Sequence, residues 1–189
     1  MVRARAAKPK GKRRKMDDYE TPENVTEALL KNVTLQGPVL EPAAGSGRMS
    51  RVLSSWKYKV TTADLKRGQD FMKRKFVWPG SIVTNPPYRD DLPEAFARKA
   101  LSLADGHVAL LVEGKWLWGS KRAAGLFSSY QPSLVIVLSS RIYFHQGSGK
   151  PIPSQFFSHC WVVWSPRAMR ELPGRSTRLV IVDQNKVPE

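Results

Sequence analysis

The run Asn85-Pro86-Pro87-Tyr88 has the residue types needed to hold a flat amino group. Its two prolines fix φ and remove two N–H donors, so the run is stiff and cannot continue a strand ladder. The Asn85 side-chain oxygen and the Pro86 carbonyl can accept the two hydrogens of an exocyclic amine, while the Tyr88 ring stacks on the ring that carries it. These acceptors favour a tetrahedral nitrogen whose lone pair is no longer delocalised into the ring. Positioning of this nitrogen would then provide most of the rate acceleration of a direct methyl transfer. A plain proline-rich turn is the alternative for this run taken alone.

A second region, Leu40 to Gly47, has the pattern of a ligand-binding turn. A short buried strand ends at Glu41, and a small-residue turn follows before a helix. Glycine permits positive φ and lets a ligand approach the backbone. The carboxylate would repel phosphate, and the Gly-Lys-Ser/Thr ending of a phosphate loop is absent. The turn therefore suits a cationic or hydroxyl-rich ligand, with a tight turn that binds nothing as the alternative.

Two further acids follow at informative spacings. Asp64 ends the next predicted strand, 23 residues after Glu41, where an acid is placed to accept hydrogen bonds from ribose hydroxyls. Asp70 precedes Phe71, and this pair could bond an adenine amino group while the ring packs nearby. A surface aspartate that caps a turn is the alternative for each acid.

The elements that would position these residues alternate between helices and strands, which predicts an α/β domain with a mainly parallel sheet. Thr21 would cap the first helix, with Pro22 in its first turn. We expect helices over residues 21–31, 47–56, 92–104 and 121–130. We expect strands over residues 39–41, 58–64, 81–84, 107–112 and 134–138, closed by an antiparallel pair over 156–164 and 178–182. Ligands bind beyond the carboxyl ends of such strands, which would gather Glu41, Asp64, Asn85 and Glu113.

The charge of the chain favours a polyanionic partner. The 189 residues carry a formal net charge of +15, of which eight positive charges lie in residues 1–15, leaving +7 on the rest. We expect a disordered basic tail over residues 1–15 and one folded domain over 16–189. No apolar run approaches the ~20 residues of a membrane span, and no signal peptide is recognisable. The oligomeric state stays open.

The single cysteine and the histidines argue against metal and disulfide chemistry. Cys160 excludes an internal disulfide, lies in an apolar run and is expected to be a buried, inert thiol. His145 and His159 have no acid or cysteine at ligand spacing, so no metal site is expected. A reducing cytoplasm fits these features best, in a bacterial or phage-infected host cell.

The sequence resembles the amino-methyltransferases, a class I S-adenosylmethionine-dependent family that modifies adenine N6 or cytosine N4 in DNA. Within the family it resembles the small phage-type adenine enzymes, because residues 160–164 resemble their closing strand. The segments that carry the resemblance are residues 19–22, 41–47, 64 with 70–71, 85–88 and 141–144. The resemblance implies a class I methyltransferase Rossmann-like fold, with a seven-stranded, mainly parallel sheet flanked by helices and an antiparallel end pair. It also implies S-adenosyl-L-methionine as cofactor.

The resemblance further implies roles for individual residues. The residues expected to contact the cofactor are Tyr19, Thr21, Pro22, Glu41, Ala43, Gly45, Gly47, Asp64, Leu65, Asp70 and Phe71. The run Asn85–Tyr88, which includes Pro87, would be the catalytic run: Asn85 and Pro86 would hold the target amine, with Tyr88 and either Tyr143 or Phe144 on the two faces of a flipped base. The residues expected to contact nucleic acid are Arg13, Arg14, Lys15, Arg141 and Lys150.

The chain departs from this family in size. The segment that could read DNA sequence, residues 145–155, is short and polar and has few groups for base edges, which predicts low or very short sequence specificity. RNA adenine, a protein glutamine amide and an inactive scaffold that binds nucleic acid are the alternatives. Cytosine N4 fits less well, because its enzymes usually have serine where Asn85 stands. Glu113 and Trp116 could border the site, although Trp116 is as readily explained by packing.

Deleting residues 1–15 should weaken nucleic-acid binding, because the tail carries eight of the positive charges. The logarithm of the binding constant should also fall less steeply with the logarithm of the salt concentration. Fluorescence anisotropy of a labelled duplex at several salt concentrations measures both quantities. An affinity equal to that of the full chain would show that the tail takes no part.

Overall fold

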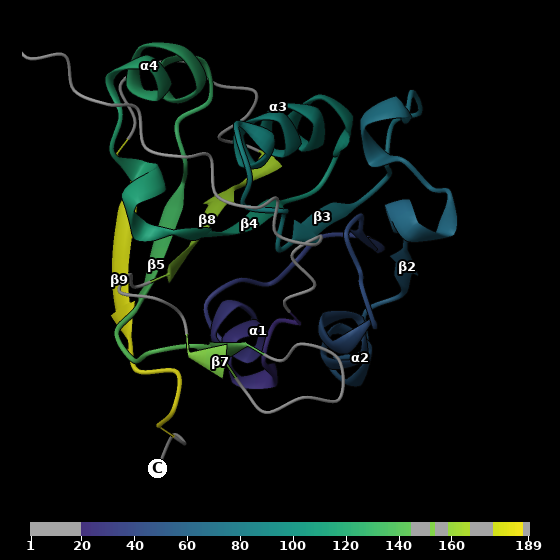
Figure 1. Ribbon diagram of the computed structural model, residues 1–189, viewed down its shortest axis with the longest axis horizontal. Coiled ribbons are helices and arrows are strands. Elements are labelled where there is room, and N and C mark those ends of the chain that lie inside the picture. Colours follow the sequence, from purple (N-terminus) through teal and green to yellow (C-terminus); the bar gives the residue numbers. More distant parts are fainter. Residues whose placement is uncertain (1–19, 145–151, 154–158, 167–175, 187–189) are drawn as a thin grey trace, which may run out of the picture.

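A twisted sheet lies between two layers of helices in the computed structural model, which describes residues 20–144, 152–153, 159–166 and 176–186 (Figure 1). The sheet has seven strands in the order β2-β1-β3-β4-β8-β5-β9. Their bounds are β1 Val39–Glu41, β2 Val60–Thr62, β3 Ser81–Thr84, β4 Val108–Glu113, β5 Leu134–Leu138, β8 His159–Trp164 and β9 Arg178–Val182. A separate two-stranded ladder pairs β6 (Tyr143–Phe144) with β7 (Ile152–Pro153).

The helices divide between the two faces of the sheet. Helices α1 (Glu23–Leu30) and α2 (Arg48–Ser55) cover one face, while α3 (Leu92–Leu103) and α4 (Ser120–Arg122) cover the other (Figure 1). Short turns complete the connections: the 3₁₀ turns η1 (Leu65–Arg67), η2 (Phe71–Lys73) and η3 (Gly114–Leu117), and the π-helical turn η4 (Ala123–Phe127). None of the described helices has the length and apolar character that a membrane crossing requires.

Strand β4 shows how the sequence builds the two layers. All of its residues before Glu113 are buried, as expected for a strand covered on both faces. Successive side chains point to opposite faces. Ala109 and Leu111 therefore join the apolar cluster under α1 and α2, whereas Leu110 and Val112 join the cluster under α3.

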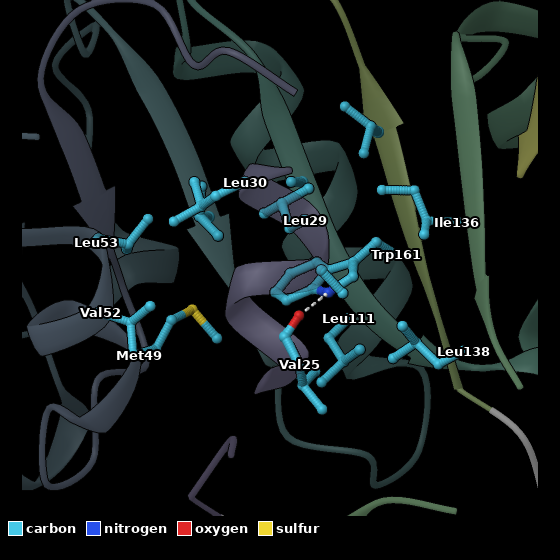
Figure 2. Close-up of a cluster of buried hydrophobic side chains, with 14 of the residues drawn as sticks. Val25, Leu29, Leu30, Met49, Val52, Leu53, Leu111, Ile136, Leu138 and Trp161 are labelled. Atoms are coloured by element: carbon cyan, nitrogen blue, oxygen red, sulfur yellow. Dashed lines mark hydrogen bonds between the residues drawn. The ribbon is translucent and has the colours of Figure 1, made fainter. Parts of the chain in front are cut away.

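Trp161 lies at the centre of the cluster under α1 and α2 (Figure 2). Its side chain is fully buried, and its indole N–H donates a 2.8 Å hydrogen bond to the Val25 carbonyl of α1. The bond joins residues 136 positions apart. The first helix is thereby attached to a strand near the end of the chain.

The expected α/β class and the seven-stranded, mainly parallel sheet are confirmed, with four strands at their predicted bounds: β1, β3, β5 and β9. The predicted pairing of the last two strands with each other is wrong. Strand β8 is antiparallel to β4 and β5, and β9 instead pairs parallel to β5 at the sheet edge. The pairing of β8 with β4 and β5 depends on which apolar faces the helices cover. Local sequence patterns do not contain this information.

Two predictions at helices also need correction. Thr21 does not cap α1, because Pro22 is the N-cap residue and its carbonyl accepts from the amides of Val25 and Thr26, whereas Thr21 is buried. The predicted helix over 121–130 is present over residues 120–129, but it is not a regular α-helix, since the π-helical turn η4 follows the three residues of α4. The basic tail and residues 145–151 and 154–158 lie outside the described residues.

Replacing Trp161 with phenylalanine should lower the free energy of unfolding by about 2 kcal/mol, because it removes buried ring volume and the bond to Val25. Trp56→Phe is the matched control, since Trp56 is 40% exposed. Urea denaturation followed by circular dichroism measures both variants. Equal stabilities of the two variants would contradict the central place given to Trp161.

Candidate active site

The carboxyl ends of β1, β3 and β4 meet at one edge of the sheet. Strand β1 is parallel to β3, and β3 is parallel to β4, with Leu40 opposite Ile82 and Thr84 opposite Leu110. Glu41, Asn85 and Glu113 stand at or directly after these ends. Asp64 follows two residues after β2, which is shorter than predicted and ends at Thr62. The gathering expected from the sequence is therefore present.

The turn after β1 is held in shape by its own backbone. The Ala63 amide donates to the Glu41 carbonyl at 2.8 Å, and the Ala44 amide donates to the Ala63 carbonyl at 3.1 Å. Gly45 (φ +51°) and Gly47 (φ +82°) adopt left-handed conformations that favour glycine. A Cβ atom placed on Gly45 would meet nothing within 4 Å, so the backbone there is open to a ligand.

Asp64 ties this turn to the segment after β2. One carboxylate oxygen accepts from the Gly45 amide and the other from the Lys66 amide, each at 2.8 Å. The Arg67 guanidinium in turn donates to the Gly45 carbonyl at 3.0 Å. A carboxylate has about four acceptor positions, so Asp64 keeps capacity for hydroxyl groups of a ligand.

The segment of Thr21 and Pro22 lies beside the same turn. Arg48, the first residue of α2 after Gly47, donates to the Glu20 carboxylate at 3.2 Å. This ion pair places two of the residues predicted to contact the cofactor next to the glycine turn. Tyr19, predicted with them, lies outside the described residues.

Glu41 is the buried acid of the site, with only 3% of its surface exposed. Burial raises the pKa of its carboxyl from 4.5 to about 7, against the opposing effect of the hydrogen bond that the Ser50 hydroxyl donates to it, while the charge of Asp64 raises it further. Near neutral pH this carboxyl can therefore exist in both forms. Its Ser50 partner, nine residues further along, gave no sequence signal.

The other predicted cofactor residues differ in exposure. Asp70 caps η2 by accepting from the Met72 amide at 2.9 Å. Phe71 is 4% exposed and packs against Phe96, with ring centroids 5.2 Å apart, so it belongs to the core beneath that turn. Leu65 is 59% exposed in η1.

The Asn85–Tyr88 run, predicted to be catalytic, follows β3 directly, and its tyrosine is fixed by the neighbouring strand. Tyr88 donates its hydroxyl hydrogen to the Leu111 carbonyl of β4 at 3.0 Å. Burial of the hydroxyl raises the pKa of Tyr88 well above its usual value, and the charge of Glu113 adds to the effect. The hydroxyl therefore keeps its proton, and the ring is what Tyr88 can offer to a ligand.

An aromatic group extends from Tyr88 toward β6. The His159 ring meets Tyr88 edge-on at 5.9 Å and Phe144 edge-on at 5.1 Å between centroids. His159 and Phe144 are buried, whereas Tyr143 is 52% exposed. Of the two aromatic residues proposed opposite Tyr88, Phe144 is connected to it indirectly, through the His159 ring, and Tyr143 is exposed. Sequence reasoning gave His159 no role, although its pairing opposite Glu113 places it there.

Most of the residues predicted to contact nucleic acid lie outside the part of the chain that the structure describes. Arg141 is exposed just before β6, while Arg13, Arg14, Lys15 and Lys150 lie outside the described residues. Across the described part of the chain, no three His, Cys, Asp or Glu side chains gather as a metal site requires. Cys160 is buried as predicted, and burial raises the pKa of its thiol to about 12.

Comparison with solved structures shows that the fold is that of the class I S-adenosylmethionine-dependent methyltransferases. A Listeria monocytogenes protein assigned to that class matches 88% of this chain and 67% of its own, with a TM-score of 0.59 and 15% identity. A Pyrococcus horikoshii protein assigned as an RNA methyltransferase matches 79% of this chain and 87% of its own, with a TM-score of 0.52 and 18% identity. No family model and no curated protein matches the sequence. Identities this low establish the fold alone, so the reaction must be argued from the site.

The raised pKa of Glu41 predicts a pH-dependent stability. Between pH 4.5 and about 7 the folded state binds more protons than the unfolded state, so this group makes stability fall as pH rises. Relative to Glu41→Gln, the wild type should lose on the order of 3 kcal/mol of unfolding free energy between about pH 4 and pH 8. Urea denaturation of both proteins at the two pH values measures this, and a constant difference between them would refute it.

Proposed function

We propose that this chain transfers a methyl group from S-adenosylmethionine to the N6 amino group of adenine in DNA, with low or very short sequence specificity. The observation that carries the proposal is the position of two loops. The glycine turn leaves β1 toward α2 on one face of the sheet, and the Asn85–Tyr88 run leaves the adjacent β3 toward α3 on the other (Figure 1). Ligands of open α/β sheets bind at this kind of crevice, where neighbouring loops diverge.

The glycine turn fits the cofactor. Its backbone is open at Gly45, and Asp64 keeps acceptor capacity for ribose hydroxyls while it fixes the turn. Glu41, when ionised, would attract a cationic ligand. When bound, the cofactor supplies a methyl group on a sulfonium.

The Asn85–Tyr88 run fits the target amine. The Asn85 amide oxygen and the Pro86 carbonyl would accept the two hydrogens of the amine and direct its lone pair to the methyl group. Tyr88, held by Leu111, would support one face of the base. Acceptors and a ring held in place would orient the bound amine toward the methyl group, and such orientation can supply much of the rate acceleration. A duplex adenine must first be flipped out, at a cost of a few kcal/mol.

The net charge of +15 is the reason to propose a nucleic acid as the carrier of the amine. Within the proposal, residues 16–189 form the methyltransferase domain and residues 1–15 attract phosphates. RNA adenine is the second candidate, because phosphate attraction does not distinguish the two polymers. An inactive scaffold that binds nucleic acid is the third.

Transfer of a radiolabelled methyl group tests the proposal directly. The chain is incubated with labelled cofactor and with DNA, RNA or protein, and each polymer is hydrolysed to identify the labelled species. The expected product is N6-methyladenine from DNA in many sequence contexts. Label in RNA alone would select the second candidate, and cofactor binding without transfer to any polymer would select the third.

Asn85→Ala should abolish transfer and leave cofactor affinity largely unchanged, because Asn85 is assigned to the target amine. Single-turnover assays measure the transfer, and isothermal titration calorimetry measures the binding of S-adenosylhomocysteine. The matched control is Asn32→Ala, since the Asn32 amide bonds the Ala28 carbonyl at the far end of α1. Loss of cofactor binding in Asn85→Ala would show that the division of the site is wrong.

A further inference from the structure

The turn η3 directly after β4 is anchored by a buried tryptophan. Trp116 is 8% exposed, and its ring meets Phe127 edge-on with centroids 5.5 Å apart. The Arg122 guanidinium lies over the same ring, 4.5 Å from its centroid, and donates to the Trp116 carbonyl at 2.5 Å. Both the side chain and the backbone of Trp116 are therefore fixed.

Arg122 is itself fixed from α3. Its guanidinium pairs with the Glu94 carboxylate at 3.2 Å, and Glu94 also pairs with Arg98 at 2.8 Å. Glu94 belongs to the first turn of α3, which begins four residues after Tyr88. The anchor thus connects η3 to the helix that continues the catalytic run.

The turn begins beside Tyr88. The carbonyl that accepts the Tyr88 hydroxyl belongs to Leu111, two residues before the end of β4 at Glu113. Gly114 then opens η3, and Trp118 directly follows it. The path from Tyr88 to Trp118 runs through one strand end and one anchored turn, so the position of Trp118 is set relative to the catalytic run.

Trp118 is exposed at the end of this fixed path. Its surface is 76% exposed, whereas Trp116, two residues earlier, is buried. Lysines stand three residues to either side: Lys115, which is 57% exposed and pairs with Glu113 at 2.5 Å, and the exposed Lys121. An exposed aromatic ring on an anchored turn, with lysines nearby in the chain, is the kind of feature on which proteins stack unpaired bases, because every base has a flat face.

We propose that Trp118 stacks on a nucleobase of the strand that carries the target adenine, and that Lys121 contacts the backbone of that strand. This inference rests on the proposed function and adds to it a base contact outside the catalytic run. The positive charge of the chain selects a nucleic acid over an apolar protein surface as occupant. Such a contact tolerates any base, which agrees with low sequence specificity.

Binding of a labelled single-stranded, adenine-containing DNA tests the contact, measured by fluorescence anisotropy with S-adenosylhomocysteine present. Trp118→Ala should weaken binding about tenfold or more, and Trp118→Phe should retain most of the affinity. Neither change should alter the salt dependence, because no phosphate contact is lost, whereas Lys121→Ala should reduce it. Trp56→Ala is the matched control, since Trp56 is exposed and lies between α2 and the start of β2, whereas the site lies beyond the carboxyl ends of the strands.

Failure of the inference and failure of the proposed function give different results. If the wild type methylates DNA and Trp118→Ala binds as well as it does, the stacking contact is refuted and the function stands. If the wild type binds no nucleic acid, both are refuted. If Trp118→Ala changes the sedimentation coefficient while leaving oligonucleotide affinity intact, the ring serves contact between copies of the chain, which also overturns the inference.

Discussion

The alignment of β1, β3 and β4 at their starts is the constraint on which the site depends. The Ser81 hydroxyl donates to the Gln36 carbonyl at 2.7 Å and accepts from the amides of Gln36 and His107, at 3.0 and 3.1 Å. One buried side chain thus joins the segments that lead into three strands. Gly80 permits this approach, because a Cβ atom there would lie 2.0 Å from the Pro38 carbonyl oxygen. Because the strands are parallel in this register, their carboxyl ends, marked by Glu41, Asn85 and Glu113, all point to the same side of the sheet.

The sequence predicted best what depends on local pattern. Residues 81–84, 134–138 and 178–182 are apolar runs bounded by polar or turn-forming residues, and each is a strand over those residues. The glycine turn was also predicted, because glycines at a strand end and a helix start have few other uses. Parallel strands bring their carboxyl ends to one edge, so correct strands gave the gathered site without further information.

The sequence predicted poorly what depends on distant partners. Strand β8 lies between β4 and β5 because both of its faces carry large buried side chains, Trp161 against α1 and Trp164 on the other face. The bond of Trp161 joins residues 136 positions apart and that of Trp164 residues 34 positions apart. The contact of His159 with Tyr88 could not be predicted for the same reason, since the pairing of β8 with β4 is what brings the two rings together. The contacts of Arg122 with Trp116 and Glu94 could not be predicted either. In a basic chain, the residues next to an arginine do not show which side chains it will contact in the fold.

The two acids of the glycine turn have different environments and so different capacities. Asp64 accepts two backbone amides and remains partly exposed, which keeps it a structural acceptor with room for hydroxyl groups. Glu41 is buried with one hydroxyl partner, and burial raises its pKa to about 7. A cation placed beside Glu41 would favour its ionised form, and by linkage an ionised Glu41 would favour the cation. The burial that costs stability at neutral pH therefore makes this acid responsive to a charged ligand, whereas Asp64 holds the turn through its bonds to the backbone amides of Gly45 and Lys66.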